Sequence, residues 1–462
     1  MNVIMKFGGT SVADAEAMTR VINIVRHQLA ANPTDKPPVV VVSAMSKVTD
    51  RLVETGRLAG ERQGDAAAKI LSDLCARHIT VASGLVSGEA LEGLKQRLAD
   101  DFDALAAHVR SWAKEGDVSP RATDELLAMG ELASSRMVAA AFAEQKIPSA
   151  WVDSRQVLVT DSEHTAAVPD MDATRAKTQQ IVGGRVAAGE IPVMGGFIGA
   201  TAAGVTTTLG RGGSDYSAAI FGACLDVDEI QIWTDVDGML TADPRVVADP
   251  QLVPQLSFAE ASELAYFGAK VLHPSTILPA VARNIPVRIL NSRRPEVKGT
   301  MITAEGRGDA GALTALACKR GVTVIDITSS RMLMAFGFLR RLFEVFERFK
   351  TPVDVVTTSE VSVSVTVDNT RRLDDILGNL RNFAEVNVEP DMAIVCIVGE
   401  NLRSDAALFG RAVTSLERIP LRLVSQAASR RNITFVMRDP DVPEAMNRLH
   451  DAFFAVGLSA KG

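Results

Sequence analysis

Short apolar runs alternate with longer stretches of helical periodicity over roughly the first 300 residues. The clearest runs are residues 3–5, 39–42, 191–194, 230–233 and 287–290. Runs of this kind predict strands that are buried on both faces. Between the first two runs, apolar residues recur at the spacing of one helix face: Met18, Val21, Ile22, Val25 and Leu29. The alternation predicts an α/β fold of three layers, with a mostly parallel sheet between helices.

The second half of the chain has a different pattern. Before it, residues 60–190 are rich in Ala, Leu, Glu and Arg and are predicted to be largely helical. After residue 300, short strands and helices follow one another twice in the same order. The first copy has a helix at 338–350 and strands at 353–357 and 361–367. The second has a helix at 408–418 and strands at 421–424 and 432–437. This doubling, with a period of roughly 70 residues, predicts two βαββαβ units, and the expected domains are 1–300, 301–385 and 386–462, with strands able to interleave between the last two.

Composition narrows the class of partner and the compartment. The net charge is −7 without a run of like charge, which argues against nucleic acid and favours a small-molecule partner. No apolar run reaches the roughly 18 residues of a spanning helix, and the first residues lack a secretory signal. The four cysteines lie far apart without a C-x-x-C pair, so we expect a cytoplasmic protein without a His/Cys metal site.

A first glycine loop, Lys6-Phe-Gly-Gly-Thr-Ser11, lies between the first strand and the first helix. Backbone amides at such a position can approach an anion, so the loop is a candidate phosphate cradle. It lacks the spacing of the Walker P-loop, because the lysine precedes the glycines. The alternative is a plain turn in which Ser11 caps the helix and Asp14 completes a capping box.

A second glycine loop, residues 206–215, runs directly into a helical pattern. Arg211 supplies a planar fork suited to a carboxylate or phosphate. Asp215 has two interpretations: it caps the helix, or it receives a cationic group such as the ammonium of an amino acid. In the second case, Arg211 and Asp215 would recognise both ends of a zwitterion.

The candidate residues share one position in the predicted sheet. Lys6, Ser43, Gly195-Gly196 and Thr234-Asp235 each lie at or just past the carboxyl end of an apolar strand. In an open parallel sheet these ends form one edge, where ligands bind. Lysine, arginine and two glycine loops at that edge predict a polyphosphate site and phosphoryl transfer. Residues 233–238 and 241–245 could hold the ribose and phosphates of a nucleotide, and the alternative is an ordinary turn. Lys270 could add a second lysine to the phosphate site, and the alternative is a solvated lysine.

The chain resembles the aspartokinases of the amino acid kinase superfamily. The resemblance rests on Lys6-Phe-Gly-Gly-Thr-Ser-Val12, Gly196-Phe-Ile-Gly199, Leu209-Gly-Arg-Gly-Gly-Ser-Asp215, Trp233-Thr-Asp-Val236, Phe267-Gly-Ala-Lys-Val-Leu-His-Pro274 and a doubled tail similar to two ACT domains. It implies the amino acid kinase fold and phosphorylation of the L-aspartate side chain by ATP and Mg²⁺. This reaction is the first step toward lysine, threonine and methionine.

The resemblance also implies roles for single residues. Lys6 and Asp215 are expected to be catalytic. The positions expected to hold aspartate are Ser43, Thr49, Glu131, Phe197 and Arg211. The positions expected around the nucleotide are Gly8, Gly9, Ser214, Thr234, Asp235, Leu240, Arg245 and Lys270. The expected effector site comprises Met332, Phe338, Val353, Asp354, Thr358, Ser359 and Glu360, for which the alternative is an ordinary strand, turn and helix face.

Regulation and assembly follow from the same resemblance. The tail is expected to bind an inhibitory amino acid, with lysine favoured over threonine, and to pair into a homodimer or homotetramer. The lysine-inhibited members carry a polar His-Ser-Arg run where this chain has Met334-Ala335-Phe336. Two other functions stay open: phosphorylation of a different acidic substrate such as glutamate, and a catalytically silent amino-acid sensor that uses only its tail.

Overall fold

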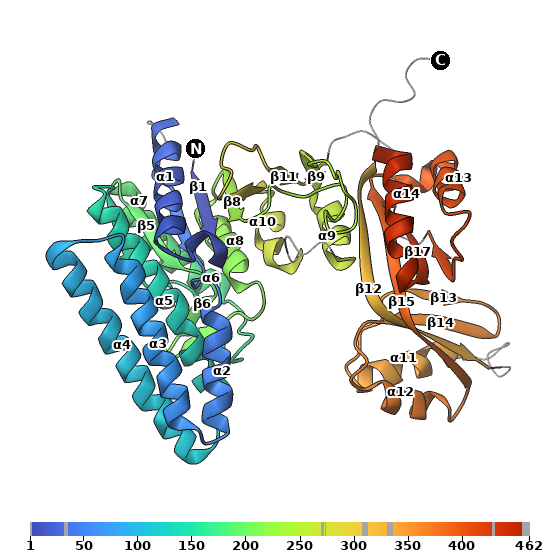
Figure 1. Cartoon of the computed structure of the whole chain (residues 1–462), viewed down its shortest axis with the longest axis horizontal. Coiled ribbons are helices and arrows are strands. Elements are labelled where there is room, and N and C mark those ends of the chain that lie inside the picture. The colour runs from blue at the N-terminus through green and yellow to red at the C-terminus, as the bar shows by residue number, and fades with distance from the viewer. Residues whose placement is uncertain are drawn as a thin grey trace. The chain divides into compact units, whose positions relative to one another are not determined.

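The fold comes from a computed structural model that describes residues 2–31, 36–268, 272, 274–306, 313–329, 336–426 and 430–454. The chain forms two compact units (Figure 1). Unit 1 comprises Met1–Met239 and Val271–Ala304, and unit 2 comprises Leu240–Lys270 and Glu305–Gly462. Residues 240–270 therefore belong to the same unit as the tail. The limits 1–300, 301–385 and 386–462 stay predictions.

Unit 1 is built around a mostly parallel sheet. Its strands are β1 (Val3–Phe7), β2 (Val39–Val42), β3 (Ser149–Val152), β4 (Val159–Thr160), β5 (Ile191–Gly195), β6 (Ile198–Thr201), β7 (Thr206–Thr208), β8 (Glu229–Thr234), β10 (Val287–Asn291) and β11 (Thr300–Thr303). Within unit 1 the main sheet has the order β3-β5-β2-β1-β8-β10-β11. The pairs are parallel except for β10 with β11. A second, small sheet contains β4, β6 and β7.

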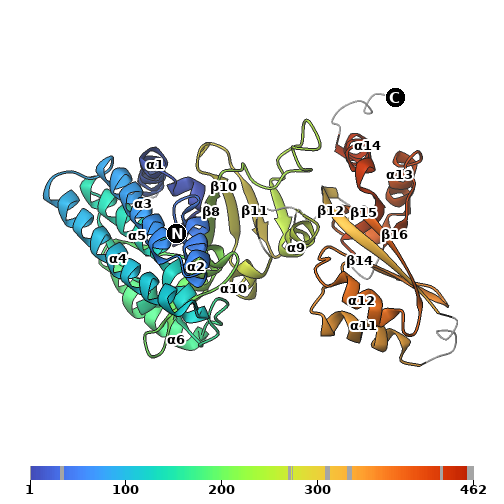
Figure 2. The ribbon, with the colours of Figure 1, turned by 60° about the horizontal axis from the view of Figure 1, so that its bottom comes forward.

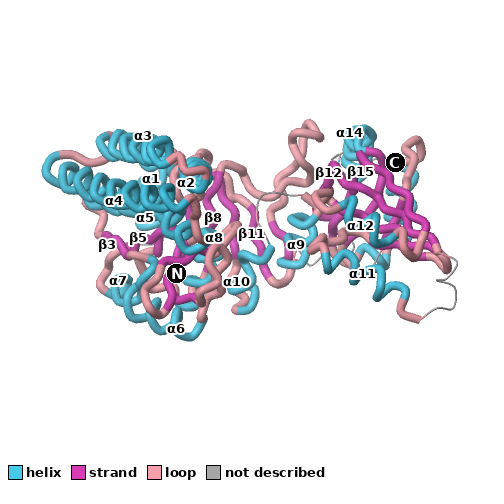
Figure 3. The backbone as a smooth tube through the Cα atoms, turned by 90° about the horizontal axis from the view of Figure 1, so that it is seen from below, coloured by secondary structure: helices cyan, strands magenta, loops and turns pink. Residues whose placement is uncertain are grey.

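Helices cover both faces of this sheet. They are α1 (Ala15–Ala31), α2 (Val48–Gly60), α3 (Gly64–Ser83), α4 (Gly88–Glu115), α5 (Pro120–Glu144), α6 (Met171–Lys177), α7 (Gly183–Ala187), α8 (Gly213–Leu225) and α10 (Leu278–Ala282). Figure 3 shows the strands of unit 1 between a layer with α1, α3, α4 and α5 and a layer with α6, α7 and α10. The long helices α2 to α5 pack side by side (Figure 1). The predicted three-layer architecture is confirmed.

The five predicted strands of unit 1 are present as β1, β2, β5, β8 and β10. In α1, the predicted apolar face is buried, with Leu29 packed at its edge. The prediction that residues 60–190 are largely helical holds in α3 to α5 and again in α6 and α7, but it is interrupted after Glu144. Beyond it the chain forms β3 and β4, whose partners β5 and β6 are distant in sequence. Helix-favouring composition was misleading there because the pairing is decided by tertiary contacts.

Helix α5 is, among the described residues, a helix long and apolar enough to cross a membrane by its length and composition. However, 78% of its most apolar window is buried inside the protein. It also carries the buried carboxylates of Asp124 and Glu131. Its apolarity is explained by its place in the interior of unit 1, where it packs on α2 and on β5.

Unit 2 contains the tail. Its strands are β9 (Gln255–Ser257), β12 (Leu313–Thr328), β13 (Val356–Thr358), β14 (Ser362–Val367), β15 (Glu385–Gly399), β16 (Leu423–Ser425) and β17 (Asn432–Arg438). Its helices are α9 (Phe258–Tyr266), α11 (Phe338–Arg348), α12 (Leu373–Leu380), α13 (Ala406–Ser415) and α14 (Val442–Phe454). An antiparallel sheet of six strands has the order β13-β14-β12-β15-β17-β16.

The two predicted repeats share this sheet. The long strands β12 and β15 pair along most of their length, and β12 contributes to two hydrophobic cores. Its Leu316 packs in the core that contains residues of α13 and α14, whereas Ile325 and Ile327 pack with α11 and α12. Figure 2 shows these helix pairs at opposite ends of the sheet. The βαββαβ repeats are therefore interleaved instead of consecutive.

Most predicted elements of the tail lie within three residues of those observed. The strand predicted at 353–357 begins three residues later, as β13 (Val356–Thr358). The Asp354 N–H donates to the carbonyl of Thr366, whose N–H donates to the carbonyl of Val355. Two successive residues thus bond to one residue of the partner strand, and the regular ladder begins only at Val356.

Candidate active site

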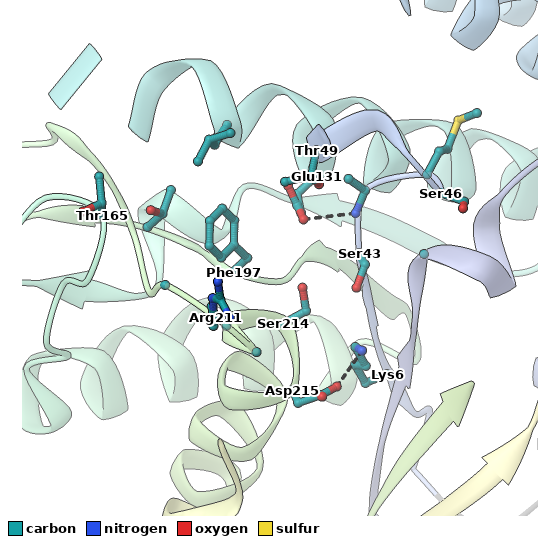
Figure 4. Close-up of a pocket in the computed structure, with 18 of the residues that line it drawn as sticks. Lys6, Ser43, Ser46, Thr49, Glu131, Thr165, Phe197, Arg211, Ser214 and Asp215 are labelled. Atoms are coloured by element: carbon teal, nitrogen blue, oxygen red, sulfur yellow. Dashed lines mark hydrogen bonds and ion pairs between the residues drawn. The ribbon is translucent and has the colours of Figure 1, made fainter. Parts of the chain in front are cut away.

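A cavity of about 580 Å³ opens at the predicted edge of the sheet in unit 1 (Figure 4). Nine residues predicted from the sequence line it: Lys6, Gly9, Ser43, Thr49, Glu131, Phe197, Arg211, Ser214 and Asp215. They come from β1, the loop after β2, α2, α5, the loop after β5 and the start of α8. Segments as far apart in sequence as Lys6 and Asp215 are thus brought together by the parallel sheet, because the ends of its strands share one edge.

Lys6 forms an ion pair with Asp215 at the floor of the cavity. The distance from Lys6 Nζ to Asp215 Oδ1 is 2.5 Å, and Lys6 is only 8% exposed. Asp215 lies in the first turn of α8, where the helix dipole favours a negative charge. Its side chain makes no capping hydrogen bond, so the capping interpretation is wrong. The cation that it receives is a side chain of the protein itself.

Close packing of backbones explains two of the glycines. A Cβ atom on Gly9 would lie 2.9 Å from the carbonyl oxygen of Ala44, and one on Gly196 would lie 2.8 Å from the Cα of Ser214. Neither position has room for a side chain. The loops after β1, β2 and β5 and the start of α8 can therefore converge on the cavity only with glycine at these positions.

Glu131 places a buried carboxylate in the cavity wall. Its Oε1 accepts a hydrogen bond from the Ala44 N–H at 3.1 Å, while Oε2 has no hydrogen-bond partner among the described residues. Burial raises the pKa of this carboxyl to about 8, although the Ala44 amide and the charge of Lys6 oppose the shift. A buried carboxylate with an open oxygen is suited to a cationic group of a ligand.

Phe197 and Arg211 occupy special backbone positions on another wall of the cavity. Phe197 has a left-handed φ of 67° and donates its N–H to Ser217 Oγ at 2.8 Å. Arg211 is exposed and is flanked by Gly210 and Gly212, both at positive φ, so its loop turns sharply on either side. The guanidinium is thereby carried at the mouth of the cavity, where a ligand carboxylate could meet it.

The proposed cap at Ser11 is wrong. Residues Gly9–Val12 form a short 3-10 helix, and Ser11 Oγ bonds to Ser292 Oγ at 2.7 Å. Asp14 makes the cap of α1 by itself, accepting from the Ala17 N–H at 2.8 Å. The sequence pattern was misread because the extra turn of 3-10 helix moves the start of α1 by several residues.

The residues predicted around the nucleotide are not all gathered at this cavity. Gly8 follows β1, and Thr234 and Asp235 end and follow β8, the neighbour of β1. Leu240 and Arg245 belong to unit 2, where Arg245 forms an ion pair with Asp243 at 2.6 Å. Lys270 lies outside the described residues.

The residues predicted for the effector are distributed over unit 2. Phe338 begins α11 and makes an edge contact with Phe383, and Val353 packs against the same core. Thr358, Ser359 and Glu360 form the exposed end of β13 and the turn that follows it. Met332 lies outside the described residues.

Asp354 has an internal partner that the sequence did not reveal. Its side chain is 3% exposed, and its Oδ1 lies 2.7 Å from Lys319 Nζ and accepts from the Tyr266 hydroxyl at 3.0 Å. Lys319 also pairs with Asp368 at 2.7 Å. Burial lowers the pKa of Lys319, but the bonds to the two carboxylates outweigh it and raise that pKa. Burial, followed by Asp354, raises the pKa of Tyr266.

Several residues lining the cavity were missed. They are Ser46, Lys47, Thr123, Leu127, Thr165 and Thr208. Thr208 lies in the threonine-rich run before Gly210, so its position beside the glycine loop was a usable signal. Thr165 offered none, because its place depends on its bond to Asp124 of helix α5 and on the bond of the nearby Ala167 to Thr208 of strand β7.

The sequence matches known proteins over most of its length. The model of the amino acid kinase family matches residues 1–291, and that of an ACT domain matches residues 395–453. Aspartokinase 3 of Arabidopsis thaliana, a chloroplastic protein, is 37% identical over 98% of this chain and 82% of its own length. Lysine-sensitive aspartokinase 3 of Escherichia coli is 34% identical over 98% of this chain and 99% of its own length.

Solved structures agree with these matches. E. coli aspartokinase III in complex with lysine and aspartate has a TM-score of 0.82, with 34% identity over 98% of this chain and 99% of that one. Its complex with aspartate and ADP has a TM-score of 0.80, also with 34% identity, over 98% of this chain and 100% of that one. The chain therefore belongs to the aspartokinases of the amino acid kinase family, with ACT domains in its tail.

Proposed function

We propose that this chain transfers the γ-phosphoryl group of ATP to the side-chain carboxylate of L-aspartate, forming 4-phospho-L-aspartate and ADP. The single observation that carries the proposal is the open carboxylate oxygen of Glu131 in the same cavity as the Lys6–Asp215 pair. The related E. coli enzyme, solved with aspartate and with ADP, supports the same assignment.

Aspartate has one cationic and two anionic groups, and the cavity offers partners for each. The Glu131 carboxylate suits the substrate ammonium, and the Arg211 guanidinium suits the α-carboxylate as a fork. Thr49 and Ser43 add hydroxyl groups near Glu131 (Figure 4). With those ends held, the side-chain carboxylate would be directed toward Lys6.

The acceptor needs no general base, because a carboxylate is already ionised at neutral pH. One of its oxygens attacks the γ-phosphorus, the bond from that phosphorus to the bridging oxygen breaks, and ADP leaves with the bonding pair. The Lys6 ammonium would stabilise the negative charge on the transferring group, and Asp215 would hold Lys6 in place. The chain thus contributes positioning and charge.

Mg²⁺ is part of the proposal as an ion that accompanies the nucleotide. Among the described residues, no cluster of three or more His, Cys, Asp or Glu side chains could hold a metal. A single carboxylate such as Asp215 in the cavity suits an ion that is bound mainly through phosphate oxygens and water, as Mg²⁺ usually is. When bound, it would neutralise phosphate charge, and Asp215, which lines the cavity, is the carboxylate expected to orient it.

A hydroxylamine-trapping assay tests the activity. Aspartate should give the hydroxamate with stoichiometric ADP, and glutamate should react at least about tenfold more slowly, because one methylene is discriminated by about 10–200-fold. Equal rates with both substrates would replace aspartate with a broader acidic substrate. If neither aspartate nor glutamate gave ADP, the remaining function would be that of an amino-acid sensor without catalytic activity.

The tail is proposed to bind an inhibitory amino acid, lysine in the first place. The support is the buried carboxylate of Asp354, together with the lysine complex of the E. coli relative. Lysine and threonine are titrated separately into the assay at fixed aspartate. Inhibition by lysine alone is expected, and a flat response to both would remove the regulatory claim.

A dimer or tetramer formed through the tail, in the cytoplasm, completes the proposal. Phe336 is fully exposed, and Leu339 and Phe343 of α11 are also exposed, which supports a contact with a second copy. Four unpaired cysteines support a reducing compartment. Light scattering should give at least twice the monomer mass, and the Phe336→Asp variant should shift it toward the monomer.

A further inference from the structure

Asp124 is a buried carboxylate behind the wall of the cavity. It is 0% exposed and lies on α5, seven residues before Glu131. Seven residues are two turns, so both carboxylates project from the same side of one helix. Unlike Glu131, Asp124 does not line the cavity. It can therefore act on a ligand only through its neighbours.

The hydrogen-bond partners of the Asp124 side chain among the described residues come from two segments distant in sequence. Asp124 Oδ1 accepts from the Thr208 hydroxyl at 2.6 Å, and both of its oxygens accept from the Thr165 N–H at 3.0 and 3.1 Å. The Nδ1–H of His164 donates to Oδ2 at 2.6 Å. Thr165 and Thr208 line the cavity. One carboxylate thus joins helix α5, strand β7 and the loop between β4 and α6.

The loop that it holds is strained and touches the second glycine loop. Thr165 has a φ of 71°, which a β-branched residue rarely adopts. Its carbonyl oxygen lies 3.2 Å from the position that a Cβ of Gly210 would take, next to Arg211. Figure 4 shows Thr165 and Arg211 across the cavity from Ser43. Contacts therefore run from Asp124 through Thr165 to the loop that carries Arg211.

We propose that Asp124 is a positioning residue for the amino-acid substrate, which fixes the cavity wall through Thr165 and Thr208 and thereby places the Arg211 loop. The inference rests on the proposed function, since aspartate is the substrate whose binding it describes. A purely structural role would alter stability and leave the binding of both substrates unchanged. A positioning role alters the KM for aspartate alone.

The first test is Asp124→Asn, which keeps the size of the side chain but replaces one acceptor oxygen with an NH₂ donor. The KM for aspartate should rise about tenfold or more, the scale of losing charge-assisted hydrogen bonds, while kcat and the KM for ATP stay within about twofold. The matched control is Glu229→Gln, which removes another buried carboxylate of unit 1, paired with Arg288 outside the cavity. The control should keep both KM values.

A second pair of variants tests the contact itself. Thr208→Val removes the hydroxyl donated to Asp124, and Thr208→Ser keeps it, so only the valine variant should raise the KM for aspartate. In the double variant with Asp124→Asn, the two effects should not add, because both remove one interaction. This pair gives an answer even where Asp124→Asn does not fold.

Three results would overturn the inference: an unchanged KM for aspartate in Asp124→Asn, additive effects in the double variant, or a Thr208→Ser variant as impaired as Thr208→Val. Failure of the proposed function is distinct, because the wild-type protein would then form no ADP with aspartate.

Discussion

Two buried carboxylates, Glu131 in unit 1 and Asp354 in unit 2, illustrate different ways of preparing a site for a cation. Each keeps one oxygen without a hydrogen-bond partner among the described residues. Glu131 has only a backbone amide on its other oxygen, and it faces a cavity. Asp354 has the Lys319 ammonium and the Tyr266 hydroxyl.

The difference lies in where the compensating charge comes from. In unit 1 it must come from the ligand, and burial accordingly raises the pKa of Glu131 to about 8. In unit 2 the chain supplies its own ammonium, so an amino acid that uses Asp354 has to compete with Lys319. The catalytic cavity therefore requires its ligand, whereas the carboxylate in the tail is satisfied without one.

The largest effect is expected at Lys6. Lys6→Ala removes the positive charge beside Asp215 and should lower kcat by about a hundredfold or more, the scale of losing one preorganised donor to the transition state. The coupled ADP assay at saturating substrates measures it. Lys69→Ala, which removes an exposed lysine paired with Asp73, should leave kcat unchanged. Turnover near wild type in Lys6→Ala would contradict the assigned role.

The next effect concerns the charge of Glu131. With a pKa of about 8, the carboxyl of the empty enzyme is mostly protonated at pH 6 and becomes ionised as the pH rises. Because the ammonium of aspartate binds the ionised form, kcat/KM for aspartate should rise about tenfold per pH unit below pH 8 and then level. In Glu131→Gln the KM should be about tenfold higher and this rise should be absent. A flat wild-type profile would contradict the shifted pKa.

The same shift has a consequence for stability. The pKa of Glu131 is raised from 4.5 to about 8 on folding, so between these values the folded protein holds more protons than the unfolded chain. The free energy of unfolding should therefore fall as the pH rises through this window. Glu131→Gln should show a smaller fall. Urea unfolding of unliganded wild type and Glu131→Gln at pH 5.5 and 8 measures the difference, and equal slopes would contradict the prediction.

The sequence predicted those features that depend on local periodicity. Strand β2 is a run of four valines, and the end of β1 carries both Lys6 and the first glycine loop. The rule that strand ends share one edge then brought Lys6, Ser43 and Gly196 to one place. Local periodicity did not predict strands β3 and β4 or the sharing of β12 between two cores, because these features depend on partners far along the chain.

The charge pairs were harder to predict than the site. Asp215 was interpreted as a partner for the ammonium of a ligand, whereas it pairs with Lys6, and nothing in its own loop identifies Lys6 as its partner. Asp354 was predicted to bind the effector, but nothing in the sequence indicated that Lys319, 35 residues earlier, is its partner. Thr165 is placed by Asp124, from which it is separated by 41 residues. Such pairs are set by the register of strands and helices, which single-sequence periodicity does not determine.

The smallest expected effects test whether Lys319 competes with the effector. Asp354→Asn should raise the half-inhibitory lysine concentration by about tenfold, because it removes a charge-assisted bond. Lys319→Met should lower it by about threefold, because the carboxylate becomes available to an external ammonium. The matched control is Arg320→Met, since Arg320 is the next residue of β12 and pairs with Asp439 outside this cluster. Inhibition curves at fixed aspartate, with kcat unchanged, measure all three. If Lys319→Met and Arg320→Met shift the curve equally, Lys319 has no particular relation to the effector, and the comparison between the two carboxylates reduces to a difference in structural pairing.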